Sequence, residues 1–260
     1  MKRRQIMTMA VVGMMCLMTA CATSPTGRKQ FIITDSRQMA AMGLQAFDEL
    51  KKKEKISTDK KTIAYVNCVT NALLRVVPPQ PEFKEWEVVV FDSKQVNAFA
   101  LPGGKIGVYT GLLDVATTQD QLAAVIGHEI GHVLANHGAE RVSQSIASNS
   151  ALQIASVSLD GEYKAQILSG LGLGLKFGVM LPFSRAHETE SDLIGLKIMN
   201  EAGFKPSQSV RLWQNMAKAS KGAPPELLST HPSSSTRIND LRSAMTTLTS
   251  AKYDAPKCRR

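Results

Sequence analysis

One short polar group inside an apolar helix constrains this chain more than any other feature. The five residues from His128 to His132 read His-Glu-Ile-Gly-His, and the apolar residues around them recur at helical spacing. Two histidines four positions apart lie on one face of a helix, one turn from each other. Buried polar side chains are costly unless a metal ion or hydrogen bonds satisfy them. The chain must therefore fold around a helix that places two imidazoles and a carboxylate together.

The ends of this helix are also marked in the sequence. Thr118-Gln119-Asp120-Gln121 has the form of a capping box, in which the first and last residues satisfy free backbone N–H groups at a helix start. Apolar residues then recur at helical spacing through Val133. We therefore predict a helix from Thr118 to about Asn136.

The polar residues of this helix suit a metal site. His128 and His132 are placed to bind one zinc ion from the same face, and Glu129, at the edge of that face, is placed to deprotonate an attacking water. This H-E-x-x-H pattern is the signature of a zinc metalloprotease. Ordinary core or surface histidines are the alternative, but the apolar surroundings favour the metal.

A two-histidine site needs a third protein ligand, and Glu188 is the best candidate. It lies where a loop enters a predicted helix that stops at Ala202-Gly203. Asp192 shares its helix face one turn along and is placed to accept the N–H of a ligating histidine, whereas Glu190 points elsewhere. The alternative for these carboxylates is a solvated acidic helix start, which the helix dipole favours.

Four sequence blocks in this order resemble a known family. H-E-x-x-H is followed by S-R-x-x-E-x-E-x-D-x-x-G from Ser184 to Gly195, with Asn97–Gly104 upstream and His231-Pro232 plus Arg237-Ile238 downstream. From Val88 to about Leu241 the chain is thereby similar to the HtpX and CAAX-prenyl-protease family of gluzincins. It most resembles the soluble or lipid-anchored branch, which includes periplasmic proteases of the BepA and LoiP type and the mitochondrial inner-membrane stress protease.

The resemblance implies a role for each matching residue of the centre. One zinc ion per chain would be bound by His128, His132 and Glu188. Glu129 would be the general base, and Asp192 would support one of the ligating histidines. The one departure is Ser191, where the family usually has alanine before the aspartate; both residues are small.

The resemblance also implies that His231 faces the metal. Two roles for His231 remain open. It would either donate a hydrogen bond to the developing oxyanion, or bind zinc in place of water and hold the resting enzyme off.

A substrate-binding edge strand is a further implication of the resemblance. It assigns this role to Asn97, Ala98, Phe99 and Ala100. An extended peptide can add to an open sheet edge through backbone hydrogen bonds, without demanding one side-chain sequence. An ordinary edge hairpin is the alternative.

The N-terminus predicts export. Three basic residues precede an apolar run from Ile6 to Ala20, which is short for a membrane span of ~20 residues but suits the core of a signal peptide. The run ends in Leu17-Met18-Thr19-Ala20-Cys21, which resembles a bacterial lipobox, so we expect Cys21 to be lipidated. Ala22 after it implies anchoring to the outer membrane of a Gram-negative cell, facing the periplasm. An ordinary secretory signal is the alternative.

The remaining cysteines fit that compartment. Cys68 and Cys258 would be the pair available in an oxidising space, and they are interpreted either as one disulfide or as a buried thiol and a loose tail residue.

The charge of the chain does not indicate a nucleic-acid partner. The formal charge is +9, but the basic residues are scattered, and no motif supports binding to nucleic acid.

The organisation expected from these features is one α+β, mainly helical domain of the zincin-like type, with a small sheet and hairpin beside the H-E-x-x-H helix. We expect a signal peptide over 1–20, a lipidated tether over 21–35 that is flexible from Ala22 to Lys29, the zinc metallopeptidase domain over 36–250, and a C-terminal tail over 251–260.

Several elements can be placed by spacing and turn residues. The pattern predicts helices over Ser36–Lys53 and Asp59–Val76, a strand over Trp86–Phe91, and a hairpin of Val96–Leu101 with Lys105–Tyr109. The glycine-rich apolar segment from Ser143 to Met180 is interpreted as a helical lid rather than a membrane span. His137 and Arg141, just after the metal helix, are expected to anchor this lid by hydrogen bonds. His137 is not expected to bind the metal, because position i+5 from His132 has rotated off the zinc face.

The function that these features favour is a zinc-dependent endopeptidase of the bacterial envelope. Its expected partners are misfolded or mislocalised envelope proteins and, through the lipid anchor, the membrane; the oligomeric state is left open. The alternative is a non-catalytic, zinc-stabilised chaperone or outer-membrane assembly lipoprotein. Such a protein would not need Glu129, so the presence of Glu129 favours the enzyme.

Overall fold

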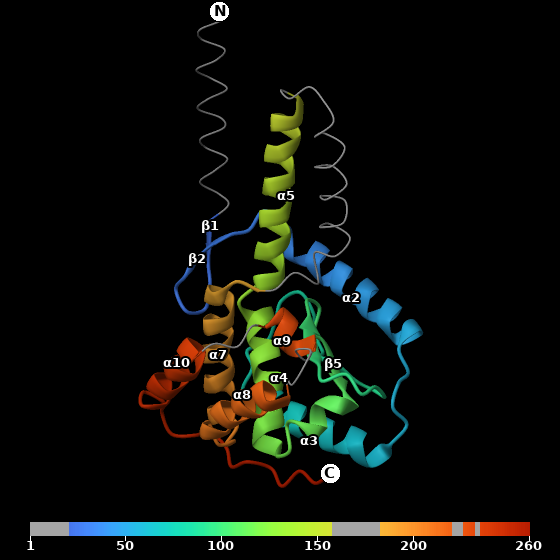
Figure 1. The fold of residues 1–260 in the computed structure, drawn as a ribbon, viewed down its shortest axis with the longest axis vertical. Helices are drawn as coiled ribbons and strands as arrows, with labels where there is room; N and C mark the ends of the chain where they lie inside the picture. The colour runs from blue at the N-terminus through green and yellow to red at the C-terminus, as the bar shows by residue number, and fades with distance from the viewer. Residues whose placement is uncertain (1–20, 158–182, 220–225, 232–234) are drawn as a thin grey trace, which may run out of the picture. The chain divides into compact units, whose positions relative to one another are not determined.

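The structure, a computed structural model, describes residues 21–157, 183–219, 226–231 and 235–260. The chain divides into two compact units, one formed by 1–35 with 139–179 and the other by 36–138 with 180–260. Figure 1 shows the chain with many of its helices and strands labelled. The predicted signal peptide and most of the predicted lid, from 158 to 180, lie outside the described residues.

The larger unit holds the elements that the sequence predicts around the histidine motif and several helices that it did not predict. Along the chain they are α2 (Ser36–Lys53), α3 (Lys60–Leu74), β3 (Glu87–Phe91), β4 (Ala98–Leu101), β5 (Lys105–Tyr109), the 3-10 helix η1 (Thr110–Asp114), α4 (Gln119–Leu134), α7 (Arg185–Glu201), α8 (Ser207–Ala219), α9 (Glu226–Thr230) and α10 (Ser235–Met245). The expected α+β, mainly helical architecture is therefore confirmed.

Three strands form the sheet of this unit, in the order β3-β5-β4. β3 runs parallel to β5, with Glu87 opposite Lys105, whereas β4 pairs antiparallel to β5, with Leu101 opposite that same lysine. Gly103 and Gly104 in the turn between β4 and β5 have φ values of +86° and +73°, a region that glycine enters without strain. β4 is consequently an edge strand, as the hairpin prediction required.

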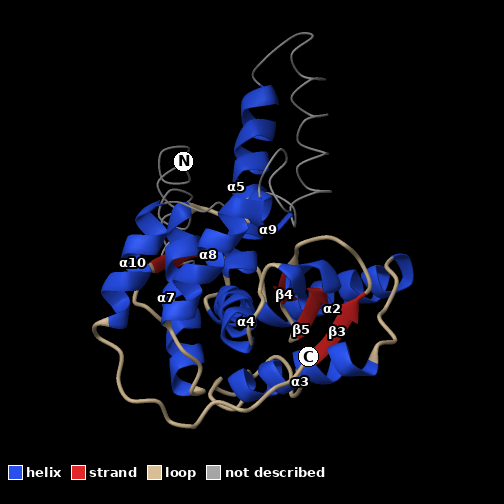
Figure 2. Cartoon of the chain, turned by 60° about the horizontal axis from the view of Figure 1, so that its bottom comes forward, coloured by secondary structure: helices blue, strands red, loops and turns tan. Residues whose placement is uncertain are grey.

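Helix α4 occupies the middle of the hydrophobic core. It packs against α7 and α8 on one side and against α3 and β4 on the other. Figure 2 shows α4 between the helical group of α7, α8 and α10 and the small sheet. Core side chains come from every layer, including Leu73, Ile106, Ile126, Met199 and Trp213. A helix surrounded in this way is buried for most of its length, which explains its nearly continuous apolar sequence.

Glycines let α4 and α7 approach each other closely. A Cβ added to Gly195 of α7 would lie 2.7 Å from the backbone nitrogen of His128, and one added to Gly127 would lie 3.1 Å from the Gly195 carbonyl oxygen. Any side chain at Gly195 would push the helices apart. The close crossing brings the acidic face of α7 over the histidines of α4.

The smaller unit contains a short hairpin and a helix. β1 (Cys21–Thr23) pairs antiparallel with β2 (Lys29–Phe31), and α5 spans His137–Val157. The Arg28 guanidinium contacts both carboxylate oxygens of Glu140, at 3.0 and 2.7 Å, and Gln30 donates to the same carboxylate. The prediction of a flexible tether from Ala22 to Lys29 is wrong, because strand pairing and this buried carboxylate fix the segment.

The C-terminal strap, residues 252–260, is fixed as well. Cys68 and Cys258 form a disulfide with a Cα–Cα distance of 5.8 Å, which decides between the two interpretations of these cysteines. The backbone N–H of Cys258 also donates to the side chain of Gln119, at the start of α4. The backbone N–H groups of Lys252 and Tyr253 donate to the carbonyl of Glu201. The strap therefore joins the middle of α3 to the start of α4 and the end of α7.

No helix within the described parts of the chain combines the length and apolar character needed to cross a bilayer.

Candidate metal centre

Local sequence signals fix where α4 begins and which of its faces meets α7. The hydroxyl of Thr118 accepts the N–H of Gln121, and the Gln121 side chain accepts the N–H of Thr117, so free groups of the first turn are satisfied at both sides of the cap. From this start, His128 and His132 fall in the second half of the helix, where both are buried.

Helix α7 is positioned by a similar cap. Ser184 accepts the N–H of His187, and Glu188 follows in the first turn. Glu188, Glu190 and Asp192 are all buried, so the alternative of a solvated acidic helix start does not apply. The serine that departs from the family pattern, Ser191, donates its hydroxyl to the carbonyl of His128 and thereby joins α7 to the motif.

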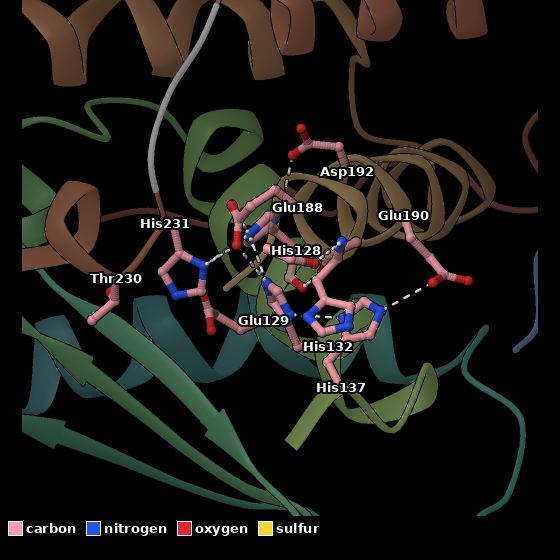
Figure 3. A network of polar contacts seen from close by, with 12 residues as sticks. His128, Glu129, His132, His137, Glu188, Glu190, Asp192, Thr230 and His231 are labelled. Carbon is pink, nitrogen blue, oxygen red and sulfur yellow. Dashed lines mark hydrogen bonds and ion pairs between the residues drawn. The ribbon is translucent and has the colours of Figure 1, made fainter. Parts of the chain in front are cut away.

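Four buried residues from three parts of the chain converge on one point. One ligand atom from each of His128, His132, Glu188 and His231 lies within 4.8 Å of the others, a grouping that can hold a metal ion. Figure 3 shows these side chains pointing toward one another, with His231 arriving from the end of α9. The structure thus brings together the three predicted ligands and the predicted extra histidine.

The distances within this cluster are short and similar. His128 Nε2 lies 3.1 Å from His132 Nε2 and 3.3 Å from His231 Nδ1. Glu188 Oε2 lies 3.5 Å from His128 Nε2, and Glu188 Oε1 lies 3.4 Å from His132 Nε2. Three imidazoles and one carboxylate therefore direct their donor atoms into the same small volume.

Electrostatics holds Glu188 in its ionised form. Burial alone would favour the neutral acid, but hydrogen bonds from His128, His132 and His231 keep the pKa of Glu188 far below its ordinary value. The Arg237 guanidinium adds an ion pair at 2.6 Å. An ionised carboxylate is the form that coordinates a cation.

His128 is supported from behind by a carboxylate, as the sequence predicted for Asp192. Its Nδ1 lies 2.9 Å from Asp192 Oδ1. Burial would lower the pKa of His128, but Asp192 and Glu188 raise it to about 9. Asp192 is itself held by Arg237, which donates to both of its carboxylate oxygens at 2.7 and 2.8 Å. Arg237 also stacks on the Trp213 ring at 4.0 Å.

Arg237 is a site residue that the sequence reasoning quoted only as part of a family block. Its contact with Asp192 joins positions 45 residues apart. The signal available in the sequence was the fixed spacing from His231 to Arg237, but spacing alone does not show which carboxylate an arginine meets.

His132 is supported differently. Its Nδ1 lies 2.9 Å from Nδ1 of His137, whose Nε2 lies 3.1 Å from Glu190 Oε2. The Phe183 ring stacks on the other side of His132, with a centroid distance of 4.0 Å. His137 therefore supports His132 by hydrogen bonding, and Glu190, predicted to point away from the metal face, is its second partner.

Glu129 stands at the edge of the cluster with one oxygen available. Among the described residues, Glu129 Oε1 has no hydrogen-bond partner, and His231 Nε2 lies 3.6 Å from it. Burial raises the pKa of Glu129 above its ordinary value, opposed by the nearby His231 and His128 and by a backbone hydrogen bond from Ala100. A buried carboxylate that is readily protonated suits a general base.

The predicted substrate-binding residues lie beside this carboxylate. Ala98, Phe99 and Ala100 form the first part of edge strand β4, and Asn97 directly precedes it. β4 packs against α4, and its Ala100 backbone contacts Glu129. The Phe99 ring lies over Gly107 and packs with Phe47 and Phe91, so it belongs to an aromatic cluster as well as to the edge.

Cys21, the predicted lipidation site, is the first residue of β1 in the smaller unit.

Comparison with known proteins agrees with the arrangement of the centre. Residues 60–245 match peptidase family M48. The chain belongs to this family. Membership confirms the family resemblance carried by the four motif blocks and the expected metallopeptidase class.

Individual relatives are metalloproteases by name. The chain is 39% identical over 182 residues to the mitochondrial metalloendopeptidase OMA1 of Schizosaccharomyces pombe, covering 69% of this chain and 52% of that protein. It is 31% identical over 211 residues to the metalloprotease LoiP of Escherichia coli, covering 80% and 81%. It is 28% identical over 213 residues to the beta-barrel assembly-enhancing protease of Yersinia pestis, covering 79% and 43%. The chain spans about half the length of the first of these relatives.

Proposed function

We propose that this chain is a zinc-dependent endopeptidase, anchored by lipid to the periplasmic face of the outer membrane, that cuts misfolded or mislocalised envelope proteins. The observation that carries the proposal is the buried convergence of His128, His132, Glu188 and His231 beside Glu129, one oxygen of which has no hydrogen-bond partner in the part of the chain that the structure describes.

The donor set fits zinc. Zinc in proteins is tetrahedral and takes imidazole nitrogens and carboxylate oxygens at roughly 2.0–2.2 Å, which places neighbouring ligand atoms roughly 3.3 Å apart. The four separations from His128 and His132 to their neighbours in the cluster range from 3.1 to 3.5 Å. Magnesium and calcium prefer oxygen ligands, so a site with three imidazoles favours zinc over them.

Zinc bound here would supply Lewis acidity, polarising the scissile carbonyl and making a water molecule easier to deprotonate. The protein's own groups then carry the protons. Glu129 accepts a proton from the attacking water at its free oxygen and passes it to the leaving amine. Asp192 and Arg237 hold His128 in its orientation during this transfer, because neither side chain is free to move in its buried ion pair.

The edge strand supports an endopeptidase rather than an enzyme acting on small molecules. A peptide pairing with β4 would run past Glu129, since the Ala100 backbone already contacts that carboxylate. Backbone pairing accepts many sequences, provided that the substrate segment is extended. Unfolded or misassembled proteins expose such segments.

The proposed location rests on the N-terminal sequence. The basic residues, the apolar run and the lipobox-like ending at Cys21 support export and lipidation. The name of the Yersinia pestis relative, a beta-barrel assembly-enhancing protease, supports an outer-membrane context. The mitochondrial relatives favour a shared catalytic domain rather than a shared compartment.

His231 is proposed to regulate access to the metal. Its Nδ1 lies 3.0 Å from Glu188 Oε1 and its Nε2 faces Glu129 at 3.6 Å. From this position it suits both the role of a removable fourth ligand and that of an oxyanion donor. We favour the removable ligand, because its Nδ1 is directed at the other ligand atoms.

Digestion of casein by the purified mature protein tests the enzymatic proposal. Cleavage should occur with the zinc-loaded protein, stop after treatment with a chelator, and return when zinc is added. Cleavage that persists after complete metal removal would overturn the mechanism. Prevention of substrate aggregation with no cleavage at any zinc level would favour the chaperone alternative.

Labelling cells with a radioactive fatty acid tests the anchor. Wild-type protein should carry the label and fractionate with the outer membrane, whereas Cys21→Ser should lose both properties. An unlabelled wild-type protein released with soluble periplasmic proteins would indicate an ordinary secretory signal.

A further inference from the structure

The two histidines of the motif are supported by different side chains. Nδ1 of His128 meets the carboxylate of Asp192 directly. Nδ1 of His132 instead meets a second imidazole, His137, and the carboxylate of Glu190 follows behind it. Both of these supporting residues are buried, with His137 0% and Glu190 4% exposed. Figure 3 shows this second line of contacts leading away from the centre on the side opposite His231.

Hydrogen-bond directions along this line follow from the metal-facing atom of His132. Its Nε2 is directed at the cluster and must present a lone pair there to bind a cation. A neutral imidazole then carries its proton on Nδ1 and donates to His137 Nδ1. His137 in turn carries its proton on Nε2 and donates to Glu190. Every contact in the line thus joins one donor to one acceptor.

The backbone between the two histidines explains how His137 reaches this position. Continued as a helix, α4 would carry residue i+5 away from the face of His132. Asn136 instead has a φ of +52°, a left-handed conformation that asparagine tolerates better than most residues. The chain turns there, and α5 begins with His137 directed back at His132.

Neighbouring rings limit the rotation of His137. The His187 ring stacks on it with a centroid distance of 4.4 Å and an interplanar angle of 27°. A side chain held by stacking and by hydrogen bonds at both nitrogens can define the orientation of its neighbour.

We propose that His137 and Glu190 are positioning residues that orient His132 and fix the tautomer in which its Nε2 binds the metal. This inference rests on the metal centre of the proposed function and assigns roles that the motif itself does not contain. Residues behind a metal ligand typically change metal affinity by about 10–100-fold when they are removed.

Zinc affinity, measured by competition with a chromogenic chelator, tests the proposal without relying on peptidase activity. His137→Phe keeps an aromatic ring but removes the acceptor, and it should weaken zinc binding by about 10–100-fold. His137→Asn places an oxygen near the position of Nδ1 and should restore most of the affinity. Glu190→Leu should weaken binding, whereas Glu190→Gln, which still offers an acceptor oxygen, should weaken it less.

A matched control is available in His187→Phe. This variant preserves the stacking on His137 but lies outside the hydrogen-bonded line, so zinc affinity should stay at the wild-type value. Visible spectra of the cobalt-substituted proteins add a readout of ligand geometry: His137→Phe should alter the absorption bands, and His187→Phe should not. Thermal melts of the metal-free variants identify any that fail to fold.

Wild-type zinc affinity in folded His137→Phe would overturn the proposal. Equal losses in His137→Phe and His137→Asn would also overturn it, because packing rather than the acceptor would then matter. If His137→Phe does not fold, an unchanged affinity in Glu190→Leu overturns it instead. A wild-type protein that binds zinc tightly but cleaves nothing would contradict the proposed function while leaving this inference open to the same measurements.

Discussion

Two regions of the larger unit fix helix α4, and they do so by opposite means. The metal centre holds the middle of α4 with buried charged and polar side chains, including the ion pairs of Arg237 with Asp192 and Glu188. The C-terminal strap contacts its start through the hydrogen bond from the Cys258 N–H to Gln119, is joined to the neighbouring α3 by the disulfide, and contributes no reacting group to the centre. Both regions are remote in sequence from the helix that they hold.

This difference predicts that the metal centre determines the activity of the protein and the strap mainly its stability. Gathering charged groups inside a protein costs desolvation energy, which their mutual interactions offset only when the geometry is good. The strap raises no such cost, because its cross-link mainly restricts the unfolded chain. Substitutions in the centre should therefore change activity more than folding, and substitutions in the strap should do the reverse.

The largest effect is expected for Glu188→Ala. Without this carboxylate only the two motif histidines remain as permanent ligands, because His231 is the removable one, so both bound zinc and peptidase activity should be lost. Metal content by mass spectrometry and casein cleavage measure the two losses, with the exposed Glu49→Ala as a control. Full zinc occupancy in Glu188→Ala would mean that another residue completes the site.

Glu129→Gln should separate metal binding from catalysis. The amide cannot accept the proton of the attacking water, while His128, His132 and Glu188 remain in place. Zinc content should be unchanged and cleavage should fall by about 10²–10⁴-fold, the usual contribution of a general base. Near-normal cleavage by zinc-loaded Glu129→Gln would refute the proposed base and promote the chaperone alternative.

His231→Ala distinguishes the two roles of that residue by the sign of the change. Removal of an oxyanion donor should lower activity by roughly 10²-fold. Removal of a ligand that blocks the resting site should raise basal cleavage or self-cleavage, and this is the result we expect. Initial rates on casein and the rate of autolysis measure both. Unchanged activity and unchanged zinc affinity would return His231 to an ordinary loop residue.

The smallest effect on activity is expected for Cys258→Ser. Loss of the disulfide that closes a separation of 190 residues should lower the free energy of unfolding by about 2–5 kcal/mol. Zinc affinity and the rate of casein cleavage should stay unchanged at temperatures where the variant is folded. Urea unfolding followed by circular dichroism gives the stability. A large loss of activity in the folded variant would contradict the separation of the two regions.

Much of this fold could be predicted from local patterns. The predicted bounds of Ser36–Lys53 match α2, and the expected hairpin matches β4 and β5 to within two residues. Apolar spacing, caps and turn residues act within a few positions of one another, so they can be read without knowing the rest of the chain. The tether from Ala22 to Lys29 was predicted wrongly, because its order depends on Glu140, more than 100 residues away.

The sequence alone determined which types of side chain form the centre. A spacing of four residues on a helix places His128 and His132 on one face whatever surrounds them, and Glu188 and Asp192 repeat the same spacing on α7. Only the tertiary structure decided which side chains meet. The close crossing at Gly195 brings the carboxylates of α7 against α4, the turn at Asn136 directs His137 back at His132, and Arg237 reaches Asp192 from α10. Such contacts depend on how distant helices pack, and no local pattern encodes that packing.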